Sequence, residues 1–223
     1  MVSLVDELLL LAYDDASGRN QAAYLELGLG GAIMLELTLA ERIDVVDGRV
    51  RVVDDAPTGE ALLDEVLRRI GEDKPRKPAA VVQRAGKGLT QPVLDELVSR
   101  GVLRYKRDKL LGVFPFHRYL PDDPTAEADA RVRLAGAVDA GAASDARTAA
   151  LASLVYALKM DAIVFPERSQ REVRKALKAI AEGSWAGDAT RKAVEAAQAA
   201  VMAAVVAATT AAAASAATSS ATG

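Results

Sequence analysis

The stretch from residue 25 to residue 67 constrains the fold of this chain more than any other segment. Its first part, Gly28–Ala40, contains three glycines and, apart from Glu36 and one threonine, only apolar residues. A helix that is apolar on all its faces is typical of the centre of a bundle. The sequence therefore predicts a central helix over Tyr24–Ala40. Its glycines would let neighbouring helices approach closely, at a cost of about 1 kcal/mol each in helix propensity.

A β-hairpin and a second helix are predicted to follow the central helix. Ile43–Val46 and Val50–Val53 are β-branched runs joined by Asp47-Gly48-Arg49, and Asp-Gly between such runs is a strong hairpin signal. The turn at Asp55–Gly59 offers an Asp and a Thr as cap acceptors, so a helix is expected over Thr58–Ile70.

Most of the remaining chain is predicted to be helical. Ser3 and Asp6 have the spacing of a capping box, which predicts a first helix that begins at Leu4. Further helices are expected at Ala79–Ala85, at Gln91–Arg100 with Thr90 as N-cap, at Thr125–Val138, at Asp145–Lys159 with a strongly amphipathic pattern, at Gln170–Ala181 and at Ala189–Ala208.

The predicted fold class is mainly α, a single-domain helical bundle with two short β-hairpins. The domain is expected to span residues 1–210, with the 24–40 and 189–208 helices at its centre. Residues 211–223 form a low-complexity Ala/Thr/Ser tail that is expected to be disordered.

The second hairpin is predicted from Val102–Lys106 and Leu110–Phe114, around a turn at Arg107–Lys109. Its cations give it a positive tip, and the aromatic side chains that follow add an apolar element suited to a membrane surface. The cations of this hairpin are Arg104, Lys106, Arg107 and Lys109, and the aromatic residues are Phe114, Phe116 and Tyr119.

Composition narrows the kinds of site that the chain can hold. The chain has no cysteine and one histidine, His117, which excludes disulfides and thiolate metal sites and leaves no metal constellation. The first residues lack the pattern of a signal peptide, and no window reaches the roughly 20 strongly apolar residues that span a bilayer. We expect a cytoplasmic protein without metal or other cofactor.

The distribution of charge suggests an anionic partner. The net charge is −3, but residues 68–118 carry 13 Lys and Arg against 5 Asp and Glu, which leaves 15 against 26 for the rest. A basic middle in an acidic protein is typical of a surface that meets an anion. The alternative is a solvated region whose charges serve solubility.

Two glycine-containing motifs invite a nucleotide-binding interpretation, which the spacing rejects. Gly28–Gly31 lacks the glycine that a dinucleotide fingerprint needs at position 33, and Arg84–Thr90 lacks the glycine and the hydroxyl residue of a phosphate loop. Lys87, between two glycines beside a helix start, remains a plausible anion contact. Glu36 is expected to be a structural carboxylate, hydrogen-bonded to backbone or paired with an arginine such as Arg42, rather than a catalytic one.

Two motifs resemble the Golgi phosphoprotein 3 family. They are GLGGAIMLELTLAERI from Gly28 and DDAPTGEALLDEVL from Asp54, and the likeness continues at 94–103, 151–165 and 201–211. This resemblance, which covers most of residues 4–211, identifies the chain as a divergent, bacterial-type member. It implies a mostly helical peripheral membrane protein that binds phosphatidylinositol 4-phosphate and acts as a non-enzymatic adaptor. It also implies self-association through the 102–114 hairpin.

The resemblance also indicates where a lipid headgroup would bind. The family pattern has an aromatic residue before the glycine run, an Arg within it and two basic residues three apart. These positions fall near Tyr24, on Gly30, and on Lys87 and Thr90. With the Arg and Trp of the pattern replaced, we expect a looser site for anionic phospholipid headgroups, formed by Lys87, Arg84, Arg19 and Tyr24.

Two alternatives come from other functional classes. Residues 58–114 also fit a winged helix that binds DNA. However, the helix that would enter the groove offers Asp95 and Glu96 and only Arg100 as a cation, so nucleic acid is not favoured. The other alternative is a protein-interaction scaffold that binds no lipid.

Overall fold

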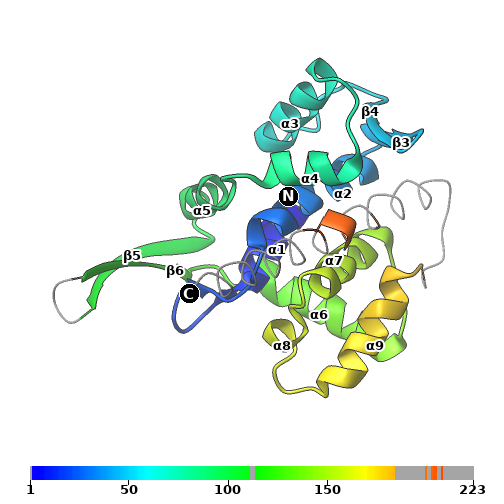
Figure 1. Cartoon of the computed structure of the whole chain (residues 1–223). Coiled ribbons are helices and arrows are strands. Elements are labelled where there is room, and N and C mark those ends of the chain that lie inside the picture. The colour runs from blue at the N-terminus through cyan, green and yellow to red at the C-terminus, as the bar shows by residue number, and fades with distance from the viewer. Residues whose placement is uncertain (1, 111–113, 184–198, 200–201, 205–206, 208–223) are drawn as a thin grey trace, which may run out of the picture.

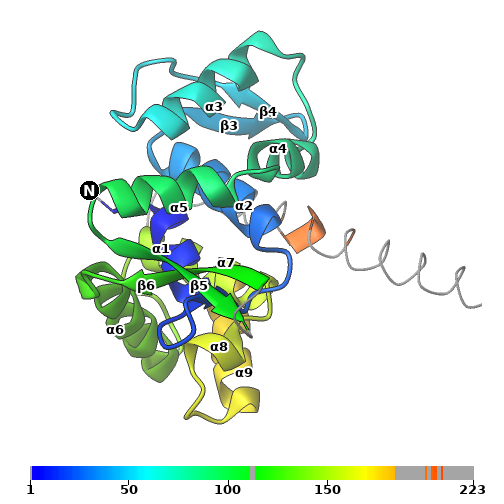
Figure 2. The same cartoon turned by 90° about the vertical axis from the view of Figure 1, so that its left-hand side faces the viewer.

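The computed structural model describes residues 2–110, 114–183, 199, 202–204 and 207. As predicted, the fold is mainly α, with three two-stranded antiparallel sheets in the described part of the chain. Two helices lie at its centre, α1 (Leu4–Ala12) and α2 (Leu25–Leu39), and the other elements surround them (Figures 1 and 2). All nine residues of α1 are buried, including Asp6 and Glu7.

Helix α1 begins at the predicted capping box. The Ser3 hydroxyl accepts a hydrogen bond from the Asp6 N–H at 3.2 Å, and the Asp6 carboxylate accepts one from the Ser3 N–H at 3.1 Å. The predicted partner of α2 at the centre, the 189–208 helix, lies largely outside the described residues. Within these residues, α1 takes the central place.

The glycines of α2 allow α4 (Pro78–Gly86) to pack directly against it, as predicted. A Cβ atom at Gly30 would lie 2.1 Å from the carbonyl oxygen of Val82, and one at Gly86 would lie 1.8 Å from the carbonyl oxygen of Glu26. Real Cβ atoms do not approach so closely. Side chains at either position would therefore force the two helices apart.

The remaining helices of the described part are α3 (Ala61–Glu72), α5 (Thr90–Ser99), α6 (Thr125–Ala140), α7 (Ala146–Ala157), α8 (Asp161–Val164) and α9 (Gln170–Ala181). Helix α7, predicted to be strongly amphipathic, is instead buried on almost every side, because it contacts α1, α2, α6, α8 and α9. Helix α9 has the one-sided pattern, burying Val173, Leu177 and Ile180.

Six charged residues form ion pairs around α1, and two of them, Asp6 and Glu7, are buried. Glu36 belongs to this ion-pair cluster and is structural, as predicted, but its partner is Arg147 at 2.8 Å rather than Arg42, which pairs with Asp54. The pairing could not be anticipated because Glu36 and Arg147 lie 111 residues apart in the chain. The cluster comprises Asp6, Glu7 and Glu36 with Arg100, Arg133 and Arg147.

The first predicted hairpin is confirmed. Strands β3 (Ile43–Val46) and β4 (Arg49–Val52) pair around Asp47 and Gly48, whose φ angles of +52° and +68° are those of a tight hairpin turn. A further small sheet, β1 (Tyr13–Asp14) with β2 (Arg19–Asn20), lies where only a turn was expected.

The second hairpin is longer than predicted, and the predicted turn at Arg107–Lys109 is wrong. Strand β5 runs unbroken over Leu103–Leu110 and pairs with β6 (Phe114–Pro121), with Arg107 opposite His117. Asp108 stays within the strand because Arg118 of β6 holds its carboxylate at 3.1 Å. The hairpin projects from the helical body (Figure 1).

Two predicted helix starts are also wrong. Helix α3 begins at Ala61, because Asp64 accepts hydrogen bonds from the N–H and hydroxyl of Thr58 and so closes a turn before the helix. Helix α5 has Leu89 rather than Thr90 as its N-cap, and Thr90 is its first residue. Helix α7, predicted from Asp145, begins at Ala146, and Asp145 is its N-cap, since its carboxylate accepts the Thr148 N–H at 2.8 Å.

Candidate functional site

A cleft of about 1000 Å³ lies between several segments of the chain, and the predicted site residue Arg19 lines it. We call it the tyrosine cleft. It is formed by β1 and β2, the start of α2, the α4–α5 connection, α5, and the base of the β5–β6 hairpin. Its lining includes Tyr13, Arg19, Glu26, Gly88, Thr90, Gln91, Asp95, Tyr105, His117 and Tyr119.

Aromatic rings form one wall of the cleft. The ring of Tyr119 packs edge-on against Tyr13 at 6.1 Å and tilted against Tyr105 at 5.4 Å, and Tyr105 stacks on His117 at 5.6 Å. Gln91 of α5 donates a hydrogen bond to the Tyr119 hydroxyl at 2.9 Å. Burial raises the pKa of Tyr13 above its ordinary value, so its phenol stays neutral. The wall therefore offers apolar faces and hydroxyl groups.

The base of the hairpin is fixed to the β1–β2 sheet. The Tyr119 N–H donates to the Gly18 carbonyl at 3.0 Å, and Arg118 donates to the carbonyls of Ser17 and Ala16. Gly18 has a φ of +65°, and a Cβ atom there would meet the backbone of Tyr119 at 2.9 Å. One backbone hydrogen bond and the Arg118 side chain therefore join segments that lie about 100 residues apart in the chain.

The charges that line the cleft have both signs. Arg19 lies over the ring of Phe116, with its guanidinium carbon 5.3 Å from the ring centre. Glu26 accepts a hydrogen bond from the Gly88 N–H at 3.0 Å, and Asp95 accepts one from Gln91 at 2.7 Å. The lining therefore contains two carboxylates against Arg19, and a phosphate group entering it would need further cations.

Lys87 and Tyr24 do not line this cleft, but each lies within two residues, along the chain, of a residue that does. Lys87 is the exposed C-cap of α4, directly before the lining residue Gly88. Tyr24 is the N-cap of α2, 40% exposed and with a φ of +58°. Because Gly86 packs on the backbone of Glu26, the end of α4 and the start of α2 lie together. Three of the four predicted headgroup residues, Arg19, Tyr24 and Lys87, thus belong to one region.

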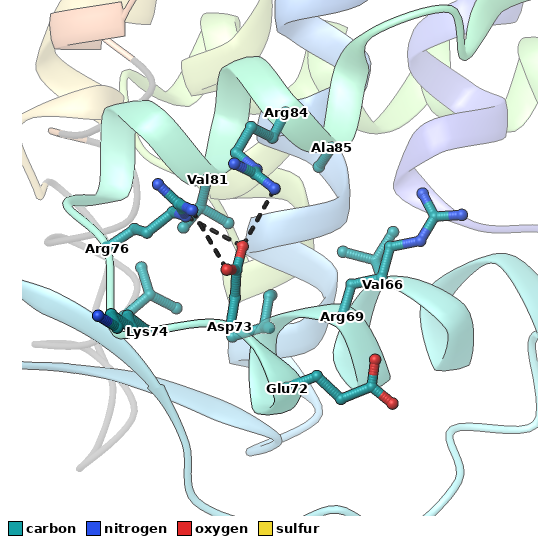
Figure 3. A pocket seen from close by; sticks show the side chains of 11 residues that line it. Val66, Arg69, Glu72, Asp73, Lys74, Arg76, Val81, Arg84 and Ala85 are labelled. Carbon is teal, nitrogen blue, oxygen red and sulfur yellow. Dashed lines mark hydrogen bonds and ion pairs between the residues drawn. The ribbon is translucent and has the colours of Figure 1, made fainter.

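Arg84 lies elsewhere. Its guanidinium points toward α3 and pairs with Asp73 at 3.1 Å, in a separate pocket between α3, α4 and β4 (Figure 3). None of the residues that line this pocket also lines the tyrosine cleft. The structure therefore separates Arg84 from Arg19.

Comparison with known proteins identifies the family. The model of the Golgi phosphoprotein 3 (GPP34) family matches residues 4–197. This chain belongs to the GPP34 family. Vacuolar protein sorting-associated protein 74 of Eremothecium gossypii is 36% identical over 87 residues, which are 33% of this chain and 26% of that relative. The chain thus matches about a quarter of the length of that relative.

Two of the three positions that the resemblance assigned to basic residues, Gly30 and Thr90, carry no charge in this chain. Gly30 leaves no space for a side chain, because α4 backbone atoms occupy it. Thr90 lines the tyrosine cleft and offers a hydroxyl. Lys87, the third of these positions, is exposed.

The basic residues of the hairpin do not gather at a tip. The register of β5 and β6 places Arg104 and Lys106 on one face, and Arg107 on the other face with Tyr105 and His117. Lys109 lies in β5, and its side chain is outside the described part of the structure. The cations therefore alternate along the arm of the hairpin.

Sequence reasoning missed the aromatic wall and the carboxylates of the cleft. Tyr105, His117 and Tyr119 share one face only in the register that the structure has, and the sequence predicted a different turn. In the described residues, no group of three or more His, Asp or Glu could hold a metal ion. Likewise, none of the helices within these residues is long and apolar enough to cross a bilayer.

Proposed function

We propose that this GPP34 protein associates from the cytoplasm with the surface of anionic membranes, and that it acts there as a non-enzymatic adaptor for other proteins. Family membership over residues 4–197 is the observation that carries this proposal. The name of the E. gossypii relative, which describes vacuolar protein sorting, supports an adaptor role. The bacterial-type assignment stays a prediction.

The proposed lipid-binding region is the mouth of the tyrosine cleft. Lys87 and Arg19 supply the positive charge, Thr90 supplies a hydroxyl, and Tyr24 is exposed beside them. Phosphatidylinositol 4-phosphate is the specific headgroup that the family suggests. Because charge-assisted hydrogen bonds contribute about 1.5 to 3 kcal/mol each, loss of the family Arg and of one basic residue favours weaker binding than the full pattern would give.

The β5–β6 hairpin is proposed as a second contact with the membrane or with another copy of the chain. Arg104, Lys106 and Arg107 are exposed along it, and among the described strands β5 pairs only with β6, which leaves the outer edge of β5 without a neighbouring strand. Such edges can pair with a strand of a second molecule, and the cations attract anionic lipid.

Two observations weigh against binding of DNA by α5. Its exposed residues include Asp95 and Glu96, and Arg100, which follows it, pairs with the buried Asp6 at 2.7 Å. The helix therefore has no free cation on the surface that would enter a groove, whereas a phosphate backbone requires several.

Liposome flotation tests the proposal. Purified protein is mixed with neutral, phosphatidylglycerol-rich and phosphatidylinositol 4-phosphate-containing vesicles, the latter two at matched net charge. We expect flotation with anionic vesicles only, reduced severalfold by Lys87→Ala. Lys175→Ala on α9 makes the same charge change on an exposed helix of another face and serves as control.

Each outcome of flotation has a defined meaning. Stronger flotation with the phosphoinositide than with phosphatidylglycerol would support a specific headgroup site, and equal flotation would support a general anionic surface. Absence of flotation with both anionic vesicles at low salt would overturn the proposal. Binding of duplex DNA in a parallel titration would then favour the winged-helix alternative.

A further inference from the structure

A second pocket of about 360 Å³ opens between α3, α4 and β4 (Figure 3). We call it the arginine pocket. Val66, Ile70 and Val81 contribute apolar surface to its floor, while Arg69, Lys74, Arg76 and Arg84 contribute cations. A pocket of this size, with an apolar floor and a few polar groups, is typical of sites for small organic ligands.

Two arginines converge on one carboxylate in this pocket. Arg76 donates to Asp73 from Nε at 3.0 Å and from Nη2 at 3.2 Å, and Arg84 Nη2 lies 3.1 Å from the same carboxylate. Figure 3 shows both guanidiniums pointing toward Asp73. One negative charge thus faces two positive charges. Each guanidinium has five N–H groups, so both retain donors after binding Asp73.

The other carboxylate of the pocket, Glu72, does not neutralise this excess of positive charge. Glu72 points away from Asp73 in Figure 3 and is bound by Arg68 at 2.6 Å. Arg69 is paired with Glu65 at 2.7 Å. The unbalanced positive charge is therefore centred on Arg76 and Arg84, with Lys74 at the edge.

The backbone fixes the groups that hold this charge. Asp73 is the C-cap of α3, and its N–H donates to the Arg69 carbonyl. The Arg76 carbonyl accepts the Val50 N–H of β4 at 2.8 Å, and Arg49 donates to the Pro75 carbonyl at 2.8 Å. Helix α4, which carries Arg84, is held against α2 at Gly30. A preorganised site of this kind loses little free energy to ordering when it binds a ligand.

We propose that the arginine pocket binds a small amphiphilic anion, a phosphate ester whose charged group is held by Arg76 and Arg84 and whose apolar chain lies on Val66, Ile70 and Val81. The phosphate restores the charge balance that Asp73 alone does not provide. Arginine suits this role because its planar N–H groups match phosphate oxygens in pairs. The ester group could belong to a soluble compound or to a lipid, and the test separates these sources.

Calorimetric titration of the full chain tests this site with three probes: hexyl phosphate, inorganic phosphate and hexanol. We expect saturable binding of hexyl phosphate, at least tenfold tighter than that of inorganic phosphate, and no measurable binding of hexanol. Arg76→Gln with Arg84→Gln should weaken hexyl phosphate at least tenfold. Asp73→Asn should tighten it severalfold, because a competing carboxylate is removed.

Matched controls separate this site from general electrostatics and from the tyrosine cleft. Arg171→Gln with Lys175→Gln makes the same change in net charge on exposed positions of α9 and should leave binding unchanged. Lys87→Ala should also leave it unchanged, so failure of the proposed membrane function would not count against the pocket. Because Arg84 is 61% exposed and Arg76 39%, the double variant is expected to fold, which thermal unfolding verifies.

Flotation with phosphatidic acid vesicles identifies the source of the phosphate. Loss of flotation in the pocket variant but not in Lys87→Ala would support a lipid ester. Unchanged flotation together with lost hexyl phosphate binding would support a soluble ester. The proposal is overturned if wild type binds no hexyl phosphate saturably, or if the α9 control weakens binding as much as the pocket variant does.

Discussion

Arginines hold carboxylates both in the ion-pair cluster around α1 and in the arginine pocket, but the two regions balance charge differently. The cluster sets three carboxylates against three arginines, and Asp6 and Glu7 within it are buried. The pocket sets two arginines against Asp73, and all three are open to water. An unpaired buried charge costs several kcal/mol, whereas solvent tolerates a surplus. A surplus of charge, rather than the number of ion pairs, therefore distinguishes a candidate binding site from a structural one.

The largest effect is expected from breaking the ion-pair cluster around α1. Arg147→Met removes the partner of Glu36 and one partner of Glu7, together with a hydrogen bond to the Val2 carbonyl. Glu36 then lacks an arginine and the buried Glu7 keeps only Arg133, so the free energy of unfolding should fall by about 2 to 4 kcal/mol. Urea denaturation measures this change.

An exposed pair provides the control for that substitution. Arg168→Met breaks the pair with Asp139, whose side chain is 64% exposed, and should change stability much less. An equal loss in both variants would mean that burial of the cluster does not decide its contribution.

A smaller effect is expected from moving α4 without touching either set of charges. Gly30→Ala places a methyl group against the Val82 carbonyl, so α4 must shift, and the free energy of unfolding should fall by about 1 to 3 kcal/mol. Hexyl phosphate binding should weaken as well, because Arg84 moves with the helix. Urea denaturation and calorimetry measure the two effects.

Gly136 of α6 is the matched control. It has open space around it, so Gly136→Ala should leave stability unchanged or raise it by about 0.5 to 1 kcal/mol through helix propensity. A similar loss in both glycine variants would contradict the role assigned to the close contact between α2 and α4.

The smallest effects are expected from two carboxylates with opposite pKa shifts. Hydrogen bonds from Arg76 lower the pKa of Asp73, so its ionised form stabilises the fold above the unfolded pKa. Asp73→Asn should therefore lower stability at neutral pH. The difference from wild type should vanish as the pH falls through the lowered pKa.

Glu60 should show the opposite sign. Burial, with the charges of Asp6 and Glu36, raises its pKa, so the ionised form destabilises the fold at neutral pH. Glu60→Gln should raise stability there, and the gain should shrink as the pH falls through the raised pKa toward the unfolded value. Thermal unfolding between pH 3 and pH 7 measures both variants, and differences of the same sign would contradict these assignments.

Local chemistry allowed much of the fold to be predicted. The capping box at Ser3, the Asp47-Gly48 turn and the apolar run of α2 all act within a few residues, and each produced the expected element. The predictions failed where contacts between residues far apart in the chain determine the local structure. Asp108 stays in β5 because of Arg118 in the next strand.

The candidate site was predictable only in part for the same reason. Lys87 and Arg19 were recognisable as cations beside turns; Arg19 lines the tyrosine cleft, and Lys87 is exposed directly before the lining residue Gly88. The position of Arg84 depends on how α3 packs against α4, which no local pattern specifies. Likewise, the tyrosine wall depends on the register of the β5–β6 hairpin.

The contact between Gly30 and the backbone of α4 has a consequence for how GPP34 sequences can diverge. A relative with arginine at this position cannot keep the spacing between α2 and α4 that is found here, since the Val82 carbonyl would occupy the place of its Cβ atom. We therefore expect residue 30 and the segment 82–86 to covary among relatives. Exchange of arginine for glycine at residue 30 would thus be a coordinated change, in which one helix advances into the space that the side chain leaves.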